Sequence, residues 1–472
     1  MRDFLPVEKA KRERVLGVIR DTYKGHGYQE IETPALEDLS RLTSGQGGDN
    51  EKLAYRVMKR GEGLERALGS SDTDALADLG LRFDLTVPLT RYYATNFSKL
   101  PRVFKAIQTG PVWRAERPQK GRYRQFVQCD IDIIGDETNL AEVDLIVSSL
   151  DALKALGIND AMIRVNDKRI LGGVLESSHI IGSEESKALI EYDKLDKKSP
   201  EEIFASLSQM STNVVALEKM FNQSQEIAKK VQDYLNQSTR ISKQIEEFNA
   251  RSMAAMQLAL ANSILSAKMP KIKLPDFSKL VGGLQSAIAS GQIQEADIRA
   301  NAPRVLDADL AFRELSQTMA LVEKIHPGKL IFDPTLVRGM GYYTGTIFEI
   351  SHQASGSSIG GGGRYDGMVG RWTGSDVPAV GISLGFERVV DLTSGLDAVG
   401  AGVVLVLDDS SAEVVANGLR VQADLRALGH SVRLELRPKK LNLLLVSMRE
   451  QGFTQWAAVD GSTVAATLKA LE

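Results

Sequence analysis

The sequence predicts an α+β fold: an antiparallel sheet core with flanking helices, a helical insertion and a C-terminal α/β domain. Apolar and polar residues alternate near residues 126–133, as they do in β-strands, and residues 347–350 are also strand-like. Long polar helical stretches rich in Gln, Ser, Lys and Glu fill residues 168–328. From about Gly400, short apolar runs such as GVVLVLD alternate with helical patterns, which is typical of a small α/β unit.

Length and composition limit the class of protein. The 472 residues are 43% hydrophobic and 25% charged, which suits a globular chain of about three domains. The N-terminus has no apolar signal core and no apolar run reaches about 18 residues, so we expect a cytoplasmic protein with no membrane span. The single cysteine, Cys129, excludes an internal disulfide and a cysteine-based metal cluster. A net charge of −3 argues against general nucleic-acid binding, so any such contact needs a local basic patch.

The predicted division separates a core in two parts from two other domains. Residues 1–167 and 329–398 form the core, 168–328 the helical insertion and 399–472 the C-terminal domain. A coiled-coil arm is the alternative for the insertion, but its heptads are broken.

The first third of the chain begins with a predicted helix at residues 7–26, where apolar residues recur at helical spacing. The extended segment YQEIETPALED follows, in which Pro34 suits a strand edge or a kink. Residues 81–94 should change from strand to helix after Pro88. Residues 139–156 are again predicted to be helical.

A basic segment joins two predicted strands. Seven basic residues lie between Arg102 and Arg124, with Glu116 as the only acid. The planar fork of arginine holds two phosphate oxygens at once, so the segment is predicted to clamp a polyanion. A solvated hairpin is the alternative. It would rarely place Gln128 and Asp132 on one face with an aromatic residue and seal the other face with apolar residues.

Four consecutive glycines occupy a predicted strand in SIGGGGRYDGMV, residues 358–369. Glycines in a strand cost conformational entropy, so something must approach this backbone closely. A phosphate loop is excluded because the G-x-x-x-x-G-K-[ST] pattern is absent and the flanks resemble strands. We interpret the glycines as the floor of a small-substrate site. Arg388 then follows a strand and a glycine turn, just inside a helix, and a salt-bridged surface arginine is the alternative there.

Together, six segments resemble the signatures of the histidyl-tRNA synthetase family, in the family's order and over nearly the whole chain. They are RDFLP (2–6), RFDLTVPL (82–89), the motif 2 block WRAERPQKGRYRQF, LVRGMGYYTG, GGGGRYDG and the motif 3 segment GISLGFER. The resemblance implies a class II synthetase core and a C-terminal anticodon-binding-like domain. It also implies a homodimer built through motif 1, which is the helix at residues 7–26 with the extended segment that ends at Pro34.

The resemblance also implies histidine-tRNA ligase activity. L-histidine and ATP would give histidyl-adenylate and pyrophosphate, and histidine would then pass to the 3′ end of tRNA(His). The resemblance implies Mg²⁺ as the counter-ion of the phosphates. It does not imply a metal site made by the protein alone. The implied catalytic residues are Arg114 and Arg338.

The implied binding residues fall into three groups. ATP would be bound by Arg114, Glu116, Arg122, Phe126 and Arg388. Histidine would be bound by Asp84, Leu85, Thr86, Gln128, Asp132, Tyr342 and Tyr343. The acceptor end of the tRNA would be contacted by Arg117 and Gln119.

Three features depart from the family pattern. Gly341 stands where the family usually has aspartate, the chain begins directly at RDFLP, and the last domain lacks the usual closing helix. The competing hypothesis is a non-catalytic histidine-sensing paralogue, such as the regulatory subunit of ATP phosphoribosyltransferase. Such paralogues tend to lose arginines that are present here, so we favour the enzyme. A pure RNA-binding protein would explain neither the glycine run nor the tyrosine pair.

Overall fold

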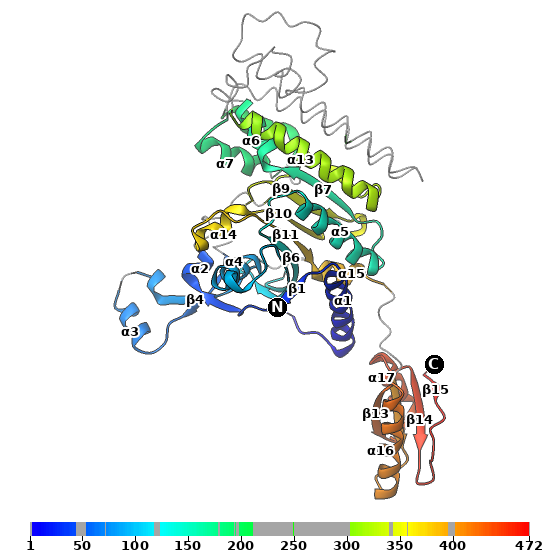
Figure 1. The fold of residues 1–472 in the computed structure, drawn as a ribbon. Helices are drawn as coiled ribbons and strands as arrows, with labels where there is room; N and C mark the ends of the chain where they lie inside the picture. The colour runs from blue at the N-terminus through cyan, green and yellow to red at the C-terminus, as the bar shows by residue number, and fades with distance from the viewer. Residues whose placement is uncertain are drawn as a thin grey trace, which may run out of the picture. The chain divides into compact units, whose positions relative to one another are not determined.

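The computed structural model describes residues 2–43, 53–70, 72–117, 123–177, 180–192, 194, 198–210, 249, 303–338, 343–355, 357–394 and 402–471 (Figure 1). These residues form two compact units, one of residues 20–389 and one of residues 2–19 with 390–472. Most of the predicted insertion lies outside the described residues, and the four-part domain division stays a prediction.

An eight-stranded sheet forms the centre of the larger unit. Its order is β1-β5-β6-β11-β10-β9-β7-β8, and every neighbouring pair is antiparallel except β1–β5 and β7–β8. The strands are β1 (Gln29–Ile31), β5 (Phe104–Trp113), β6 (Gln125–Ile134), β7 (Met162–Asp167), β8 (Leu330–Phe332), β9 (Thr346–Ser351), β10 (Gly360–Arg364) and β11 (Ala379–Gly385). The sheet is therefore rich in antiparallel pairs, as predicted, and it brings segments far apart in the sequence side by side.

Helices cover this sheet and a small second sheet extends from it. Helices α6 and α13 pack together, and α13 also contacts α5 and β7 (Figure 1). The helices of this unit are α2 (Leu39–Thr43), α3 (Glu62–Leu68), α4 (Thr86–Asn96), α5 (Leu140–Ala155), α6 (Lys168–Ser177), α7 (Ser183–Tyr192), α8 (Pro200–Ser208), α13 (Pro303–Ile325) and α14 (Asp366–Thr373), with short 3-10 turns at Asp74–Leu76, Phe97–Lys99 and Gln353–Ser355. The second sheet has the order β2 (Leu36–Asp38), β4 (Ala77–Leu81), β3 (Tyr55–Met58).

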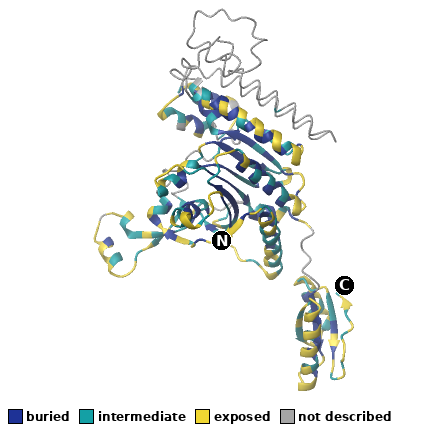
Figure 2. Cartoon of the chain, in the orientation of Figure 1, coloured by how far each residue is buried: buried dark blue, intermediate teal, exposed yellow. Residues whose placement is uncertain are grey.

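The buried core lies between the sheet and its helices, as the dark residues of Figure 2 show. One cluster joins Phe83 and Leu89 at the start of α4 to Phe104 of β5 and to Tyr365 and Val369 around α14. This cluster places the segment after β4, the motif 2 hairpin and the glycine strand around one interior. The three segments that carry most of the predicted site residues are thus packed against each other.

Two further helices span the sequence boundaries between the two compact units. Helix α1 covers Pro6–Gly25, close to the predicted bounds, and α15 covers Phe386–Leu392 directly after β11. No helix in the described part of the chain is long and apolar enough to cross a membrane.

The structure corrects one detail of the predicted elements. Helix α4 begins at Thr86 and not after Pro88, because proline is tolerated in the first turn of a helix. On the polar face of β6, Asp130 and Asp132 are only 4% and 3% exposed. Strand β11 pairs with β6 along this stretch and contributes to that burial. Pro34 lies between β1 and β2, which belong to different sheets, in agreement with the expected kink.

The free edge of the main sheet at β8 is covered by a side chain. Asn249 donates from Nδ2 to the Leu330 carbonyl oxygen at 3.3 Å and accepts from the Phe332 amide at 3.1 Å. It satisfies the backbone groups that an additional strand would otherwise pair with. A residue of the predicted insertion is thereby bonded to the core.

The smaller unit contains a three-layer α/β arrangement. Strand β12 (Gly402–Leu407) lies between parallel neighbours β13 (Ser431–Leu436) and β14 (Gln455–Val459), and β15 (Lys469–Ala470) pairs antiparallel to β14. Helix α16 (Ala412–Ala427) packs on one face, and α17 (Leu441–Glu450) packs on the other through Met448. Every residue of β12 is buried, which explains its continuous apolar run. No helix follows β14 among the described residues up to 471.

Candidate active site

One pocket of about 300 Å³ collects five of the predicted residues. Arg114 and Phe126 come from the two sides of the β5–β6 hairpin, Arg338 precedes β9, and Arg388 belongs to α15. Glu116 lies on the same wall. The remaining lining residues are Tyr123, Gly385, Phe386 and Glu387. Three arginines line this pocket beside two glutamates, and arginine is the side chain best suited to hold a polyphosphate.

Arg114 is fixed by the segment that precedes α4. Its Nε donates to the Phe83 carbonyl oxygen at 2.9 Å, and its guanidinium carbon lies 5.0 Å from the centroid of the Phe126 ring. The backbone amide of Arg114 donates to the Arg124 carbonyl oxygen at 2.9 Å, which closes the hairpin. The pocket therefore contains an arginine side chain that is stacked against an aromatic ring.

Motif 3 is tied to the same hairpin from the other side. Glu387 Oε1 accepts from the Val127 amide at 3.2 Å. Arg388 donates to the Ser358 carbonyl oxygen, just before the glycine strand. These contacts fix the start of α15 between β6 and β10.

The glycine run makes room for two predicted side chains. A Cβ atom at Gly361 would lie 2.7 Å from Nη1 of Arg338, and one at Gly363 would lie 3.0 Å from the Tyr343 ring. The same Cβ atoms would also lie 2.8 Å from the Phe348 carbonyl oxygen and 2.7 Å from the Thr346 carbonyl oxygen of β9, so both positions require glycine. The close approach expected from the sequence is made by the neighbouring strand as well as by Arg338 and Tyr343.

Three acids have raised pKa values: Asp130 and Asp132 are buried on β6, and Asp84 lies just before α4. Burial raises the pKa of Asp132 from 3.8 to about 7, opposed by the Tyr365 hydroxyl, and nearby Asp84 raises it further. Burial and the neighbouring Asp132 raise the pKa of Asp130 well above its ordinary value. For Asp84 burial again raises the pKa, while a bond from the Val87 amide and the charge of Arg114 oppose it. Such a cluster favours a ligand that brings positive charge or donates several hydrogen bonds.

Gln128 shows an acceptor without a donor. Its Nε2 donates to Ser383 Oγ at 3.2 Å and lies 3.4 Å from both oxygens of Asp130. Its Oε1 is buried and accepts no hydrogen bond within the described part of the chain. A buried acceptor in this condition costs about 1–3 kcal/mol, so a donor from a ligand would be favoured there.

The segment carrying Asp84, Leu85 and Thr86 is positioned by its backbone. Asp84 Oδ1 accepts from the Val87 amide at 3.2 Å, at the N-terminal end of α4. Gln108 of β5 donates to the Leu85 carbonyl oxygen at 3.2 Å. These bonds hold the segment beside β5, at the N-terminal end of α4.

Sequence reasoning missed two residues of this site. The Tyr365 hydroxyl donates to Asp132 Oδ1 at 2.6 Å. Gly381 pairs with Asp132 in the β6–β11 register, and a Cβ there would lie 1.9 Å from Asp132 Oδ1. GGGGRYDG was recognised as a segment, but only the register shows that its tyrosine reaches β6.

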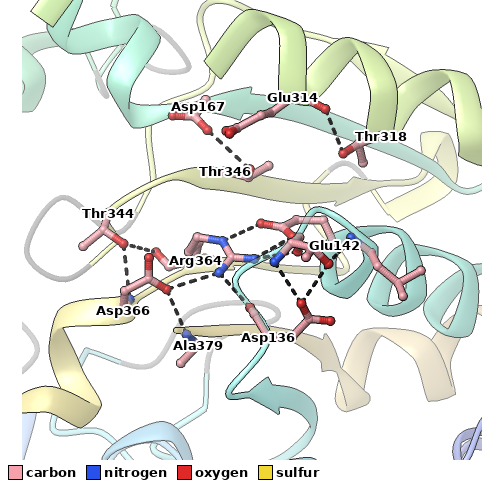
Figure 3. Close-up of polar contacts among 12 residues, drawn as sticks. Asp136, Glu142, Asp167, Glu314, Thr318, Thr344, Thr346, Arg364, Asp366 and Ala379 are labelled. Atoms are coloured by element: carbon pink, nitrogen blue, oxygen red, sulfur yellow. Dashed lines mark hydrogen bonds and ion pairs between the residues drawn. The ribbon is translucent and has the colours of Figure 1, made fainter. Parts of the chain in front are cut away.

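Arg364 and Asp366 flank Tyr365 in that motif, and both are anchored by polar contacts (Figure 3). Arg364 makes two bonds of 2.7 Å to the carboxylate of Glu142 on α5, and both side chains are buried. Asp366 accepts from the Ala379 amide at 2.8 Å, and its own amide donates to Thr344 Oγ1 at 3.2 Å. Removing one member would leave a buried charge unpaired, so this network holds Tyr365 firmly in place.

Some residues singled out in the sequence lie outside the described part of the chain or outside the pocket. Arg122, Gln119 and Tyr342 lie outside the described residues, as does Gly341. Arg117 is exposed and does not line the pocket.

Comparison with known proteins agrees with the fold. The sequence profile described as Histidyl-tRNA synthetase matches residues 1–268 and 259–389. The chain belongs to the histidyl-tRNA synthetase family. The histidine–tRNA ligase of Leifsonia xyli subsp. xyli is 44% identical over 99% of this chain and 96% of its own length. The sequence-based assignment to this class II aminoacyl-tRNA synthetase family is confirmed.

Two solved structures share the fold. Histidyl-tRNA synthetase from Nostoc sp. PCC 7120 has a TM-score of 0.63 and 23% identity, covering 100% of this chain and 93% of that one. A Bacillus halodurans C protein described as an ATP phosphoribosyltransferase regulatory subunit/histidyl-tRNA synthetase has a TM-score of 0.61 and 17% identity, covering 98% and 97%. At such identities these likenesses concern the fold alone. The sequence comparison goes further, because the 44% identical relative is a histidine–tRNA ligase, which favours the enzyme over the histidine-sensing paralogue.

Proposed function

We propose that this protein is a histidine–tRNA ligase that activates L-histidine with ATP and transfers it to tRNA(His). The observation that carries the proposal is the pocket in which Arg114, Phe126, Arg338 and Arg388 meet, together with the buried acids of β6. A carboxylate oxygen of histidine attacks the α-phosphorus of ATP, and the bond to the bridging oxygen breaks to release pyrophosphate. The terminal adenosine hydroxyl of the tRNA then attacks the activated carbonyl, and AMP leaves.

The arginines neutralise the negative charge that these steps concentrate. Arg114 and Arg338 flank the α-phosphate, and charged donors held in place before the reaction stabilise its transition state most effectively. Arg122 and Arg388 hold the outer phosphates, while the Phe126 ring and the Arg388 guanidinium enclose the adenine. The Arg114 guanidinium carbon lies 5.0 Å from the Phe126 ring centroid, so the arginine proposed for the α-phosphate and the ring proposed for the adenine are neighbours in this pocket.

Mg²⁺ fits the same pocket as a companion of ATP. It commonly binds through one or two carboxylates and substrate phosphates, and Glu116 and Glu387 line the pocket. The described residues contain no group of three or more side chains that could hold a metal by themselves. When bound with ATP, Mg²⁺ would offset phosphate charge.

Histidine occupies the acid-lined side of the site. Asp84, Thr86 and Gln128 bind the α-ammonium group, beside the backbone of Leu85, and the buried Gln128 Oε1 is the acceptor that this group would satisfy. Asp132, with Tyr343 and Tyr342, binds the imidazole. A site that supplies an acceptor and a hydroxyl to two ring nitrogens discriminates strongly against isosteres that cannot pair with them.

Further roles follow from family membership. Arg117 and Gln119 would contact the acceptor end of the tRNA, and the exposure of Arg117 is compatible with that contact. We also propose a homodimer and a cytoplasmic location.

Charging of a tRNA(His) transcript with radiolabelled histidine tests the full reaction. The proposal predicts histidyl-tRNA that depends on ATP and on intact Arg338. Measurable histidine binding without any charging would favour the histidine-sensing paralogue instead.

A further inference from the structure

Arg338 lies at the end of a chain of ion pairs that crosses three strands. Its Nε donates to Glu349 Oε2 at 2.6 Å. The other oxygen of Glu349 accepts from Arg164 Nη1 at 2.7 Å, and Arg164 Nε donates to Asp333 Oδ2 at 2.6 Å. Charges therefore alternate from the pocket to the end of β8.

The sheet itself sets this chain. Arg164 of β7 is the register partner of Glu349 of β9, and Asp333 directly follows β8, the parallel neighbour of β7. The Asp333 amide donates to the Val165 carbonyl oxygen at 2.9 Å, and Asp333 Oδ1 accepts from the Thr335 amide at 2.8 Å. The end of the chain farthest from the pocket is thus anchored to backbone.

The two carboxylates are well shielded from water. The side chains of Glu349 and Asp333 are only 15% and 17% exposed, compared with about a third for the two arginines. Burial alone would lower the pKa of Arg164, but Asp333 and Glu349 raise it above its usual value. The central arginine is thus held between both acids.

We propose that Glu349 and Arg164 are positioning residues that fix the guanidinium of Arg338 for adenylate formation. This inference rests on the catalytic role proposed for Arg338. Glu349 Oε2 contacts Nε and Nη2 of Arg338, while Nη1 lies over Gly361. Arg164 occupies the other oxygen of Glu349, so the carboxylate is held from both sides.

The physical need for such a support is geometric. Arginine has several rotatable bonds, and a displacement of about 1 Å from the reactive position can lower a rate about 100-fold. Removing the charge of Glu349 would also leave two arginines near each other with no acid between them. Arg338 would then leave its position over Gly361.

The chain offers a matched control in Arg169. This arginine also bridges two carboxylates, Asp167 and Glu314, each at 2.8 Å, and its side chain is 29% exposed compared with 34% for Arg164. Asp167 and Glu314 appear in Figure 3, and neither lines the pocket. A purely structural ion pair should therefore behave like the Arg169 pair.

The test is histidine-dependent ATP–pyrophosphate exchange by the full-length protein. Glu349→Gln and Arg164→Met should each lower kcat about 10- to 100-fold, with histidine KM changing less than about 3-fold. Arg169→Met should remain near wild type. Thermal unfolding of each variant shows whether a loss of rate reflects a loss of fold. If Glu349→Gln does not fold, Arg164→Met still tests the inference, because Arg164 binds the other oxygen of Glu349.

A double-mutant cycle with Arg338→Ala separates positioning from structure. Adding Glu349→Gln to Arg338→Ala should produce no further loss, because the residue it positions is already gone. Equal losses in both backgrounds, or a kcat no lower than that of Arg169→Met, would overturn the inference. Absence of exchange in the wild type would instead contradict the proposed function itself.

Discussion

Replacing Asp132 by asparagine should stabilise the protein in a pH-dependent way while it abolishes activity. The carboxyl is 3% exposed, and burial raises its pKa from 3.8 to about 7. Because the folded-state pKa is the higher one, ionisation of Asp132 destabilises the native state. This cost is small below pH 4, grows between pH 4 and 7, and is complete above pH 7.

The magnitude follows from that difference in pKa. Each pKa unit corresponds to about 1.4 kcal/mol, so the full cost of ionising Asp132 is about 4 kcal/mol. Between pH 5 and pH 8 the free energy of unfolding of Asp132→Asn should rise by about 3 kcal/mol relative to wild type. Histidine-dependent exchange should be lost at both values, because Asp132 is the residue proposed to bind the imidazole.

Urea denaturation at pH 5 and pH 8 measures this effect. Asp78→Asn is the control, because Asp78 is exposed on β4 and its replacement should change stability equally at both pH values. A variant Asp132→Asn that is less stable than wild type at pH 8 would refute the reasoning. It would mean that the ionised carboxylate stabilises the folded chain.

Three further substitutions test other parts of the site. Arg338→Ala should lower kcat for exchange by about 100-fold or more while histidine affinity and the unfolding temperature stay near wild type, and near-normal adenylation would remove its assigned role. Gly361→Ala should also lower kcat, because its Cβ would lie 2.7 Å from Arg338 Nη1 and 2.8 Å from the Phe348 carbonyl oxygen, whereas Gly367→Ala, with nothing within 4 Å, should have no effect on the exchange rate. Tyr365→Phe removes the hydroxyl that lowers the pKa of Asp132, so the pH midpoint for histidine KM should rise by about one unit; an unchanged midpoint would contradict this coupling.

Sequence periodicity predicted local elements well where the pattern is set by neighbours in the chain. Helix α1 was expected at residues 7–26 and is found at 6–25, and α5 was expected at 139–156 and is found at 140–155. The start of α4 was misplaced because Pro88 was taken as a boundary, although a first helical turn accepts proline.

Features that depend on strand register were not accessible from the sequence. Alternation along β6 placed Asp130 and Asp132 on one face. It did not show that β11 pairs alongside β6 and helps to bury them. The bond from Tyr365 to Asp132 joins residues 233 positions apart. Glu349 and Arg164 likewise become partners only through the pairing of β7 with β9.

The central claim is that this pocket adenylates histidine, and ATP–pyrophosphate exchange without tRNA tests it most directly. Purified protein should be assayed with each of the twenty amino acids. The account predicts exchange with histidine and with no other amino acid. Absence of exchange despite measurable histidine binding, or equal exchange with another amino acid, would contradict it.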